Sequence, residues 1–282
     1  MIGRLPGLLF CLALVVGCSD ETVVETMPSD AVTSTTDAES TTSVGQPTTT
    51  ESATMTTVDQ GPLEVLAFHK TAAFRHESIG AGIETLEGIG EDGGYRVTAT
   101  DDASVFSTQG LDRYSVIVFL NTTGDVLDEA QQTAMEDFIS AGKGFLGVHS
   151  AADTEYDWNW YGTLVGAYFD GHPEPQDAVV DFVEPDAHPI TERLPGQVTR
   201  FDEWYNFRSQ PPDDATVLAT VDEASYEGGA MGDPHPIIWA RRVHGGRSVY
   251  IGFGHTSESF EEPLMRRLLD NAIRWAAGAE GA

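Results

Sequence analysis

The sequence predicts an α/β fold in which a doubly wound, mainly parallel sheet carries helices on both faces. Short apolar runs, typical of strands that are buried on both faces, alternate along residues 63–148 with segments of helical periodicity. Glycines end the helical segments, and polar residues follow the apolar runs. The resulting order β-α-β-β-α-β indicates parallel strands joined by crossover helices.

The first half of the predicted domain contains four strands and two helices. Strands are expected at residues 63–68, 95–100, 116–120 and 145–148. The first helix carries apolar residues at helical spacing from Ile79 to Ile89 and ends at the glycine pair 93–94. The second helix begins after Asp128, which has Gln131 three residues later as in a capping box, and it ends at Gly142.

The second half is less regular. Further strands are expected at residues 178–183, 216–220, 237–240 and 248–251. A terminal helix begins with Pro263 at its first position, carries Leu268 and Trp275 on its apolar face, and ends at Gly278. Residues 62–282 are therefore expected to form one domain, which is long enough to bury a substantial core.

The first 61 residues predict export. Residues 1–17 form a short apolar segment with one early cation, as in a signal peptide. The segment ends in Val-Val-Gly-Cys, which resembles a bacterial lipobox and implies lipidation of Cys18; the alternative is an ordinary signal peptide with an incidental cysteine. Residues 18–61, rich in Ser, Thr and acids without Lys, Arg or aromatics, indicate a disordered tether. The expected location is the cell envelope, with a lipid anchor in a membrane, and Ser19 is compatible with the outer membrane.

Composition excludes several classes of function. The only cysteines are Cys11 and Cys18, so the domain has no disulfide, thiol nucleophile or cysteine-ligated metal. A formal net charge of −30 would repel a phosphate backbone, so we expect no nucleic acid partner. The eight histidines leave a divalent metal open, but no tight ligand spacing is present, so the fold would have to assemble about three ligands. The metal stays unknown, and no cofactor is firmly implied.

The clearest candidate site follows the strand predicted at residues 145–148. This strand ends abruptly at a polar cluster that contains His149, Ser150 and Asp153. Ligands of open α/β sheets bind outside the carboxyl ends of the strands. Gly-x-His-x-Ala also has the spacing of a nucleophile elbow, the sharp turn that exposes one side chain. A histidine at this position suits an acid, a base or a metal ligand.

Two other predicted strands also end near histidines. Arg75 and His76 follow the first strand; Arg75 could fix a carboxylate or a sugar hydroxyl, or could form a capping ion pair with Glu77. His255 ends a late strand and could lie beside His149.

Aromatic residues and acids suggest a sugar ligand. Trp158, Trp160 and Tyr161 are interleaved with carboxylates, which suits a sugar ring, although such aromatics could equally cover the edge of the sheet. Asp202 and Glu203 would point to opposite sides of an extended chain, so only one can face a pocket. That carboxylate could be a general acid or base, and the alternative is a structural acid that binds backbone amides.

From about Leu63 to Gly278 the chain resembles the ThuA-like (trehalose utilisation) family. The matching segments lie in the family's order at residues 74–76, 144–153, 157–161, 202–205, 235–239 and 254–256. The resemblance implies a flavodoxin-like sheet related to the class I glutamine amidotransferases. Those enzymes have a cysteine at the position of His149, so we expect no glutaminase activity here.

The resemblance also implies processing of a disaccharide or of a 3-keto-glycoside by acid–base chemistry without a covalent nucleophile. In this hypothesis Glu203 or His149 is the base, and His255 or His76 is the acid or the enolate stabiliser. The alternatives are a non-catalytic carbohydrate-binding surface module and a scaffold on a degenerate amidotransferase fold. The residues expected to bind the sugar are Arg75, Asp153, Trp158, Trp160, Tyr161, Asp202, Tyr205 and His235.

Overall fold

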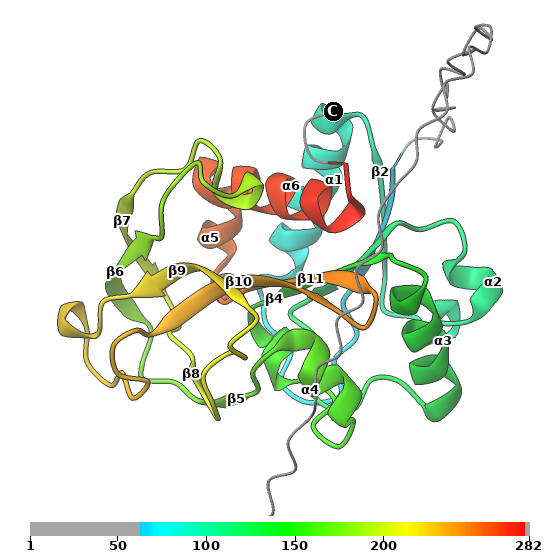
Figure 1. Ribbon diagram of the computed structural model, residues 1–282, viewed down its shortest axis with the longest axis horizontal. Helices are drawn as coiled ribbons and strands as arrows, with labels where there is room; N and C mark the ends of the chain where they lie inside the picture. Colours follow the sequence, from blue (N-terminus) through cyan, green and yellow to red (C-terminus); the bar gives the residue numbers. More distant parts are fainter. Residues whose placement is uncertain (1–62, 280–282) are drawn as a thin grey trace, which may run out of the picture. The chain divides into compact units, whose positions relative to one another are not determined.

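The computed structural model describes residues 63–279, which are built around a nine-stranded sheet with the order β2-β1-β3-β4-β11-β10-β9-β6-β7 (Figure 1). Five neighbouring strands, in the order β2-β1-β3-β4-β11, are parallel. If β11 is counted as the fifth parallel strand along the chain, this order is the 2-1-3-4-5 of flavodoxin-like folds. The predicted fold class is therefore confirmed. These strands are β2 (Arg96–Thr100), β1 (Glu64–Phe68), β3 (Val116–Leu120), β4 (Gly144–Val148) and β11 (Gly246–Ile251).

The remaining four strands of the sheet pair antiparallel. They are β10 (Pro236–Val243), β9 (Thr216–Val221), β6 (Gln176–Phe182) and β7 (Gln197–Asp202). Buried and partly exposed residues alternate along β6, whereas β3 and β4 are buried throughout. This difference shows that the central strands β3 and β4 are covered on both faces of the sheet, whereas one face of β6 is partly exposed. Two short strands, β5 (Phe169–Gly171) and β8 (Asn206–Phe207), form a separate ribbon.

The three longest helices are those that the sequence predicts. In α1 (Ile79–Gly93) the chain ends in a left-handed cap at Gly94, with φ of 74°. In α3 (Glu129–Ser140) the capping box of Asp128 and Gln131 is formed. In α6 (Pro263–Ala277) proline occupies the first turn, and Gly278 caps the end. Figure 1 shows α1 and α6 on one face of the sheet and α3 on the other, as expected of a doubly wound fold.

Shorter elements complete the domain. The helices α2 (Thr108–Leu111), α4 (Asn159–Val165) and α5 (Ser257–Glu261) have too few turns for a periodic signal in the sequence. A close approach of α6 to β4 depends on Gly144, where a Cβ atom would lie 2.5 Å from the carbonyl oxygen of Ala276. Four 3₁₀ turns lie at Ala103–Val105, His149–Asp153, Pro189–Thr191 and Glu223–Ser225.

The predicted signal peptide, lipidated Cys18 and tether, residues 1–61, lie outside the described residues. Within residues 63–279, no helix has both the length and the apolar character needed to cross a bilayer.

Candidate functional site

The four predicted catalytic residues meet at one point of the fold. His76, His149, Glu203 and His255 each present one nitrogen or oxygen atom, and these four atoms lie within 4.8 Å of one another. His76 comes from the β1–α1 loop, His149 and Glu203 directly follow β4 and β7, and His255 lies in the segment after β11. We refer to these four residues as the histidine–glutamate cluster. It lies at the carboxyl edge of the parallel strands, where open α/β sheets bind ligands.

His149 occupies a strained turn directly after β4. Its φ angle of 48° is in the left-handed region, which costs a non-glycine residue about 1–2 kcal/mol. The predicted strand-to-helix elbow is therefore present in the backbone. The fully buried ring donates a hydrogen bond from Nδ1 to the carbonyl of Gly252 (3.0 Å), and the ring of Tyr205 lies 4.3 Å away, centroid to centroid. These contacts direct Nε2 of His149 towards Glu203.

Glu203 is the centre of the cluster. Its Oε2 atom lies 3.4 Å from Nε2 of His149 and 3.2 Å from Nδ1 of His255. Burial alone would raise the pKa of Glu203, but the two facing histidines outweigh burial and hold that pKa well below its usual range. Glu203 is therefore a carboxylate at neutral pH.

The other two histidines differ in their electrostatics. Burial, together with the neighbouring His149 and His255, lowers the pKa of His76 to about 3, so this ring is neutral at pH 7. Its Nδ1 atom lies 3.3 Å from Oγ of Ser150. The contact with Glu203 raises the pKa of His255 against the opposing effect of burial. His255, whose side chain is 25% exposed, therefore holds a proton more readily than His76.

Asp202 holds the backbone beside His255. Its carboxylate accepts hydrogen bonds from the N–H groups of His255 (3.0 Å) and Gly254 (3.2 Å) and from Oγ–H of Ser259 (2.7 Å), and it pairs with Arg200. The side chain is fully buried among these partners, so Asp202 is a structural acid that binds backbone amides. As the alternation of an extended chain predicts, only Glu203 of the two neighbouring acids faces the cluster.

The position of Asp202 also shows how Glu203 is brought to the three histidines. Three strands lie between β7 and β11 in the sheet, which corresponds to about 19 Å if the sheet were flat. Asp202 at the end of β7 nevertheless contacts Gly254, just after β11. The antiparallel half therefore curls back over the carboxyl edge of the parallel half and brings Glu203 to the histidines.

His172 is a member of the site that the sequence did not predict. Its Nδ1 atom lies 3.1 Å from Oε1 of Glu203 and 2.8 Å from the carbonyl oxygen of Pro173. Only a proton on Nδ1 satisfies both acceptors, so Nε2 carries the lone pair. The side chain is 37% exposed at the edge of the cluster. In the sequence, this residue stands out only because a proline follows it, as a proline also follows His188 and His235.

Three of the predicted sugar-binding residues lie beside the cluster or in its loops. The Tyr205 ring contacts His149, and Arg75 is exposed and donates a hydrogen bond to the carbonyl of His69 (3.1 Å). Asp153 accepts a hydrogen bond from the Tyr156 hydroxyl (2.7 Å), and burial raises the pKa of its carboxyl group.

The predicted sugar-binding aromatics lie elsewhere. Tyr161 is fully buried in the core, where its hydroxyl donates to the carbonyl of Ala151, so it cannot stack on a ligand. Trp158 and Trp160 stack on each other at 4.9 Å, and Trp160 also stacks on His244 at 4.5 Å. His244 precedes β11, whereas the cluster follows it, so these tryptophans cover the opposite end of the sheet.

Two further residues complete the surroundings. His235 is buried and donates from Nε2 to the carbonyl of Tyr205 (2.9 Å), so it supports the site through Tyr205 and does not line it. Phe74 is 63% exposed, and its ring lies edge-on to His76 with 4.8 Å between centroids. An exposed aromatic ring at this position offers a flat apolar surface beside the cluster.

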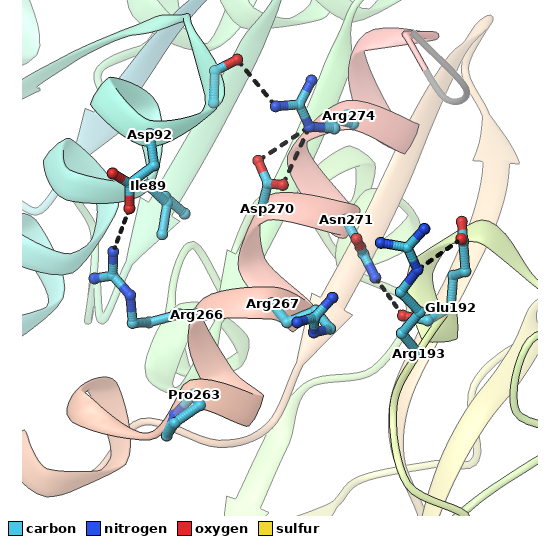
Figure 2. A pocket seen from close by; sticks show the side chains of 11 residues that line it. Ile89, Asp92, Glu192, Arg193, Pro263, Arg266, Arg267, Asp270, Asn271 and Arg274 are labelled. Atoms are coloured by element: carbon cyan, nitrogen blue, oxygen red, sulfur yellow. Dashed lines mark hydrogen bonds and ion pairs between the residues drawn. The ribbon is translucent and has the colours of Figure 1, made fainter.

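The largest cavity described lies away from the cluster. This groove of about 760 Å³ runs along α1 and α6, and no cluster residue lines it (Figure 2). Its charged side chains are mostly paired, since Arg266 contacts Asp92 and Arg274 contacts Asp270. The groove contains no histidine, so it lacks the acid–base groups that the cluster brings together.

Comparisons with known proteins agree with this fold. A family model described as ThuA, trehalose utilisation, matches residues 64–276. A ThuA-like protein from Bacteroides uniformis aligns at 24% identity over 78% of this chain and 94% of its own, with a TM-score of 0.66. One from Parabacteroides merdae aligns at 17% identity over 79% and 92%, also at 0.66. A cytoplasmic protein of Salmonella typhimurium LT2 reaches 0.56 at 11% identity, over 76% of this chain and 99% of its own. A search of curated proteins finds no match.

Proposed function

Because the chain belongs to the trehalose utilisation (ThuA) family, we propose that it processes a carbohydrate at the histidine–glutamate cluster. The observation that supports a reaction is the convergence of four titratable side chains within 4.8 Å, among which the pKa values of His76, Glu203 and His255 are shifted. A module that only bound sugar would need hydroxyl partners and aromatic faces, but it would not need this buried set of ionisable groups. The family description supports sugar chemistry in general, and the particular reaction is our proposal.

The proposed substrate is a glycoside oxidised at C3. The ketone acidifies the neighbouring C2–H, so a base can remove that proton, and the electron pair then forms the enolate. The enolate expels the glycosidic oxygen from C1, which restores the ketone and leaves a C1–C2 double bond. The departing oxygen takes up a proton, and water can add to the double bond. Every atom and electron is balanced without an oxidant.

We propose a role for each exposed group on the basis of this geometry. His172 is the proposed base, because its Nε2 carries a free lone pair and its side chain reaches solvent. The same ring, once protonated, can deliver its proton to the glycosidic oxygen. The contact with Glu203 raises the pKa of His255 and so favours its protonated form, which suits stabilisation of the enolate oxygen. A carboxylate with so low a pKa is a weak base, so Glu203 orients both histidines and does not take the proton itself.

Substrate contacts follow from the residues around the cluster. Phe74 offers the exposed aromatic face, and Arg75 and Asp153 offer a donor and an acceptor for hydroxyl groups. This arrangement replaces the tryptophan pair of the sequence-based hypothesis with Phe74.

The direct test incubates the full chain with 3-keto-trehalose, 3-keto-glucosides and the parent sugars, and follows the products by NMR. Release of sugar from the keto forms alone is the expected result. Saturable NMR shifts of a sugar without turnover would indicate a non-catalytic carbohydrate-binding surface module. No change with any of these sugars would favour the alternative of a scaffold that binds no sugar.

We also propose that the chain is exported and anchored by lipid at Cys18, as its first residues predict. Radiolabelled palmitate should label the wild-type chain in a bacterial host and should not label Cys18→Ser. Equal labelling of both chains would contradict this part of the proposal.

A further inference from the structure

Two nitrogen atoms of the histidine–glutamate cluster are buried without a hydrogen bond. Nε2 of His149 and Nδ1 of His255 both face Oε2 of Glu203 at 3.4 and 3.2 Å, but neither contact has hydrogen-bond geometry. Buried polar atoms normally have a hydrogen-bond partner, so two such atoms directed at one carboxylate oxygen require an explanation.

The tautomer of His149 determines what its Nε2 atom presents to Glu203. Its Nδ1–H donates to the carbonyl of Gly252, so in the neutral ring Nε2 carries a lone pair. That lone pair then faces an anionic oxygen in a buried site, which is unfavourable unless Nε2 takes up a proton or a metal ion lies between the two atoms. The contact does not have the geometry of a hydrogen bond through such a proton, which favours the metal ion. A metal-bound histidine has this same arrangement, in which one ring nitrogen donates to a backbone carbonyl and the other binds the ion.

The spacing of the donor atoms suits a small ion. Zinc lies about 2.0–2.2 Å from nitrogen and oxygen ligands, so two ligands of a tetrahedral ion are separated by about 3.3–3.5 Å. The distances of 3.2 and 3.4 Å from Glu203 are close to this value. The four donor atoms lie within 4.8 Å of one another, so the widest pair needs to contract to bind one ion.

We propose that His76, His149, His255 and Glu203 form a binding site for a divalent transition-metal ion. Three imidazoles and one carboxylate favour zinc or a neighbouring first-row metal over calcium and magnesium, which prefer oxygen ligands.

The residues around the cluster are arranged as supports for such ligands. Gly252 accepts from His149, Ser150 lies beside Nδ1 of His76, and Asp202 fixes the backbone of His255. His172 contacts the other oxygen of Glu203 and stays outside the donor set.

The role of the ion rests on the proposed function. A bound metal polarises a ketone oxygen, so it would supply the positive charge that His255 supplies without it. His172 remains the base in both cases, because it is not a ligand.

The test measures binding without any sugar. The full chain is stripped with a chelator, dialysed and titrated with zinc chloride by calorimetry, and a parallel sample receives cobalt(II) for visible spectroscopy. We expect one zinc per chain and cobalt bands typical of nitrogen ligation. His255→Ala and Glu203→Gln should weaken zinc binding at least about 100-fold. His244→Ala, which removes a histidine outside the cluster, should leave binding unchanged.

The circular dichroism spectrum of each variant is compared with that of the wild type, so that loss of zinc binding can be distinguished from loss of the fold. Absence of stoichiometric binding by the wild type, or equal affinity in the folded Glu203→Gln variant, would overturn the metal site. Binding without sugar turnover would keep the site and overturn the proposed reaction. Turnover by a stripped protein that binds no zinc would keep the reaction and overturn the site.

Discussion

Asp202, the last residue of β7, accepts a hydrogen bond of 3.0 Å from the backbone N–H of His255, which follows β11. The two residues lie at the ends of strands that are far apart in the sheet order. This contact ties the antiparallel half of the sheet to the parallel half at the point where the cluster forms. The contact also positions Glu203, which follows Asp202 in the chain and faces the ring of His255.

Asp202→Asn should therefore reduce both stability and activity. The substitution removes the charge that compensates the buried Arg200, and it replaces one acceptor oxygen with a donor that faces backbone N–H groups. We expect a loss of about 2–4 kcal/mol in the free energy of unfolding, measured by urea denaturation. Asp181→Asn, which affects a more exposed contact with Gln197 on β7, is the control and should cost less than about 1 kcal/mol. Equal losses in the two variants would contradict the assigned role.

His172→Ala should abolish most turnover of 3-keto-glycosides while the fold is retained. Removal of a general base slows a reaction by about 10²–10⁴-fold, and a partly exposed side chain contributes little to stability. His244→Ala is the matched control, because it removes a histidine at the other end of the sheet. A value of kcat within a few-fold of wild type in His172→Ala would remove this residue from the reaction.

Phe74→Ala should raise KM more than it lowers kcat. The ring is 63% exposed beside His76, so its loss removes a stacking surface and leaves the core intact. We expect KM to rise about tenfold, since an aromatic contact contributes about 0.5–1.5 kcal/mol beyond its buried area. Phe201→Ala, which removes a 49% exposed ring from β7, should leave KM unchanged. The same KM in both variants would show that no sugar stacks on Phe74.

Trp160→Ala should leave KM unchanged and lower stability. Trp160 stacks on Trp158 and His244 at the end of the sheet away from the cluster. Its loss should cost about 1–2 kcal/mol in thermal or urea unfolding. A large rise in KM with unchanged stability would restore the tryptophans to the sugar site.

The sequence predicted most of the fold because its signals are local. Apolar runs of strand length and the caps at Gly94, Asp128 and Gly278 each mark an element within a few residues. The short helix α4 could not be found in this way, and its absence from the prediction explains the misplacement of Tyr161. Helical geometry turns this residue towards Phe119 and Phe145 in the core, whereas the sequence shows only an aromatic beside other aromatics.

The site was partly predictable for a different reason. His149 and His255 follow neighbouring parallel strands, so topology alone places them together. Glu203 follows β7, and it reaches the cluster only because the antiparallel half of the sheet curls back. No local pattern in the sequence encodes that curl. His172 depends on the ribbon of β5 and β8, whose strands of three and two residues are too short to show periodicity. Its significance becomes clear only from its distance to Glu203.

The most direct measurement of the central claim follows the hydrogen at C2 of the substrate. The wild-type chain and His172→Ala are incubated with 3-keto-trehalose in D₂O, beside a sample without protein, and the sugars are analysed by NMR and mass spectrometry. We predict that the wild-type product carries deuterium at C2 or lacks a hydrogen there. This product should form much faster with the wild-type chain than with the variant or in the sample without protein. Turnover that keeps the original hydrogen at C2 would contradict proton abstraction at the cluster.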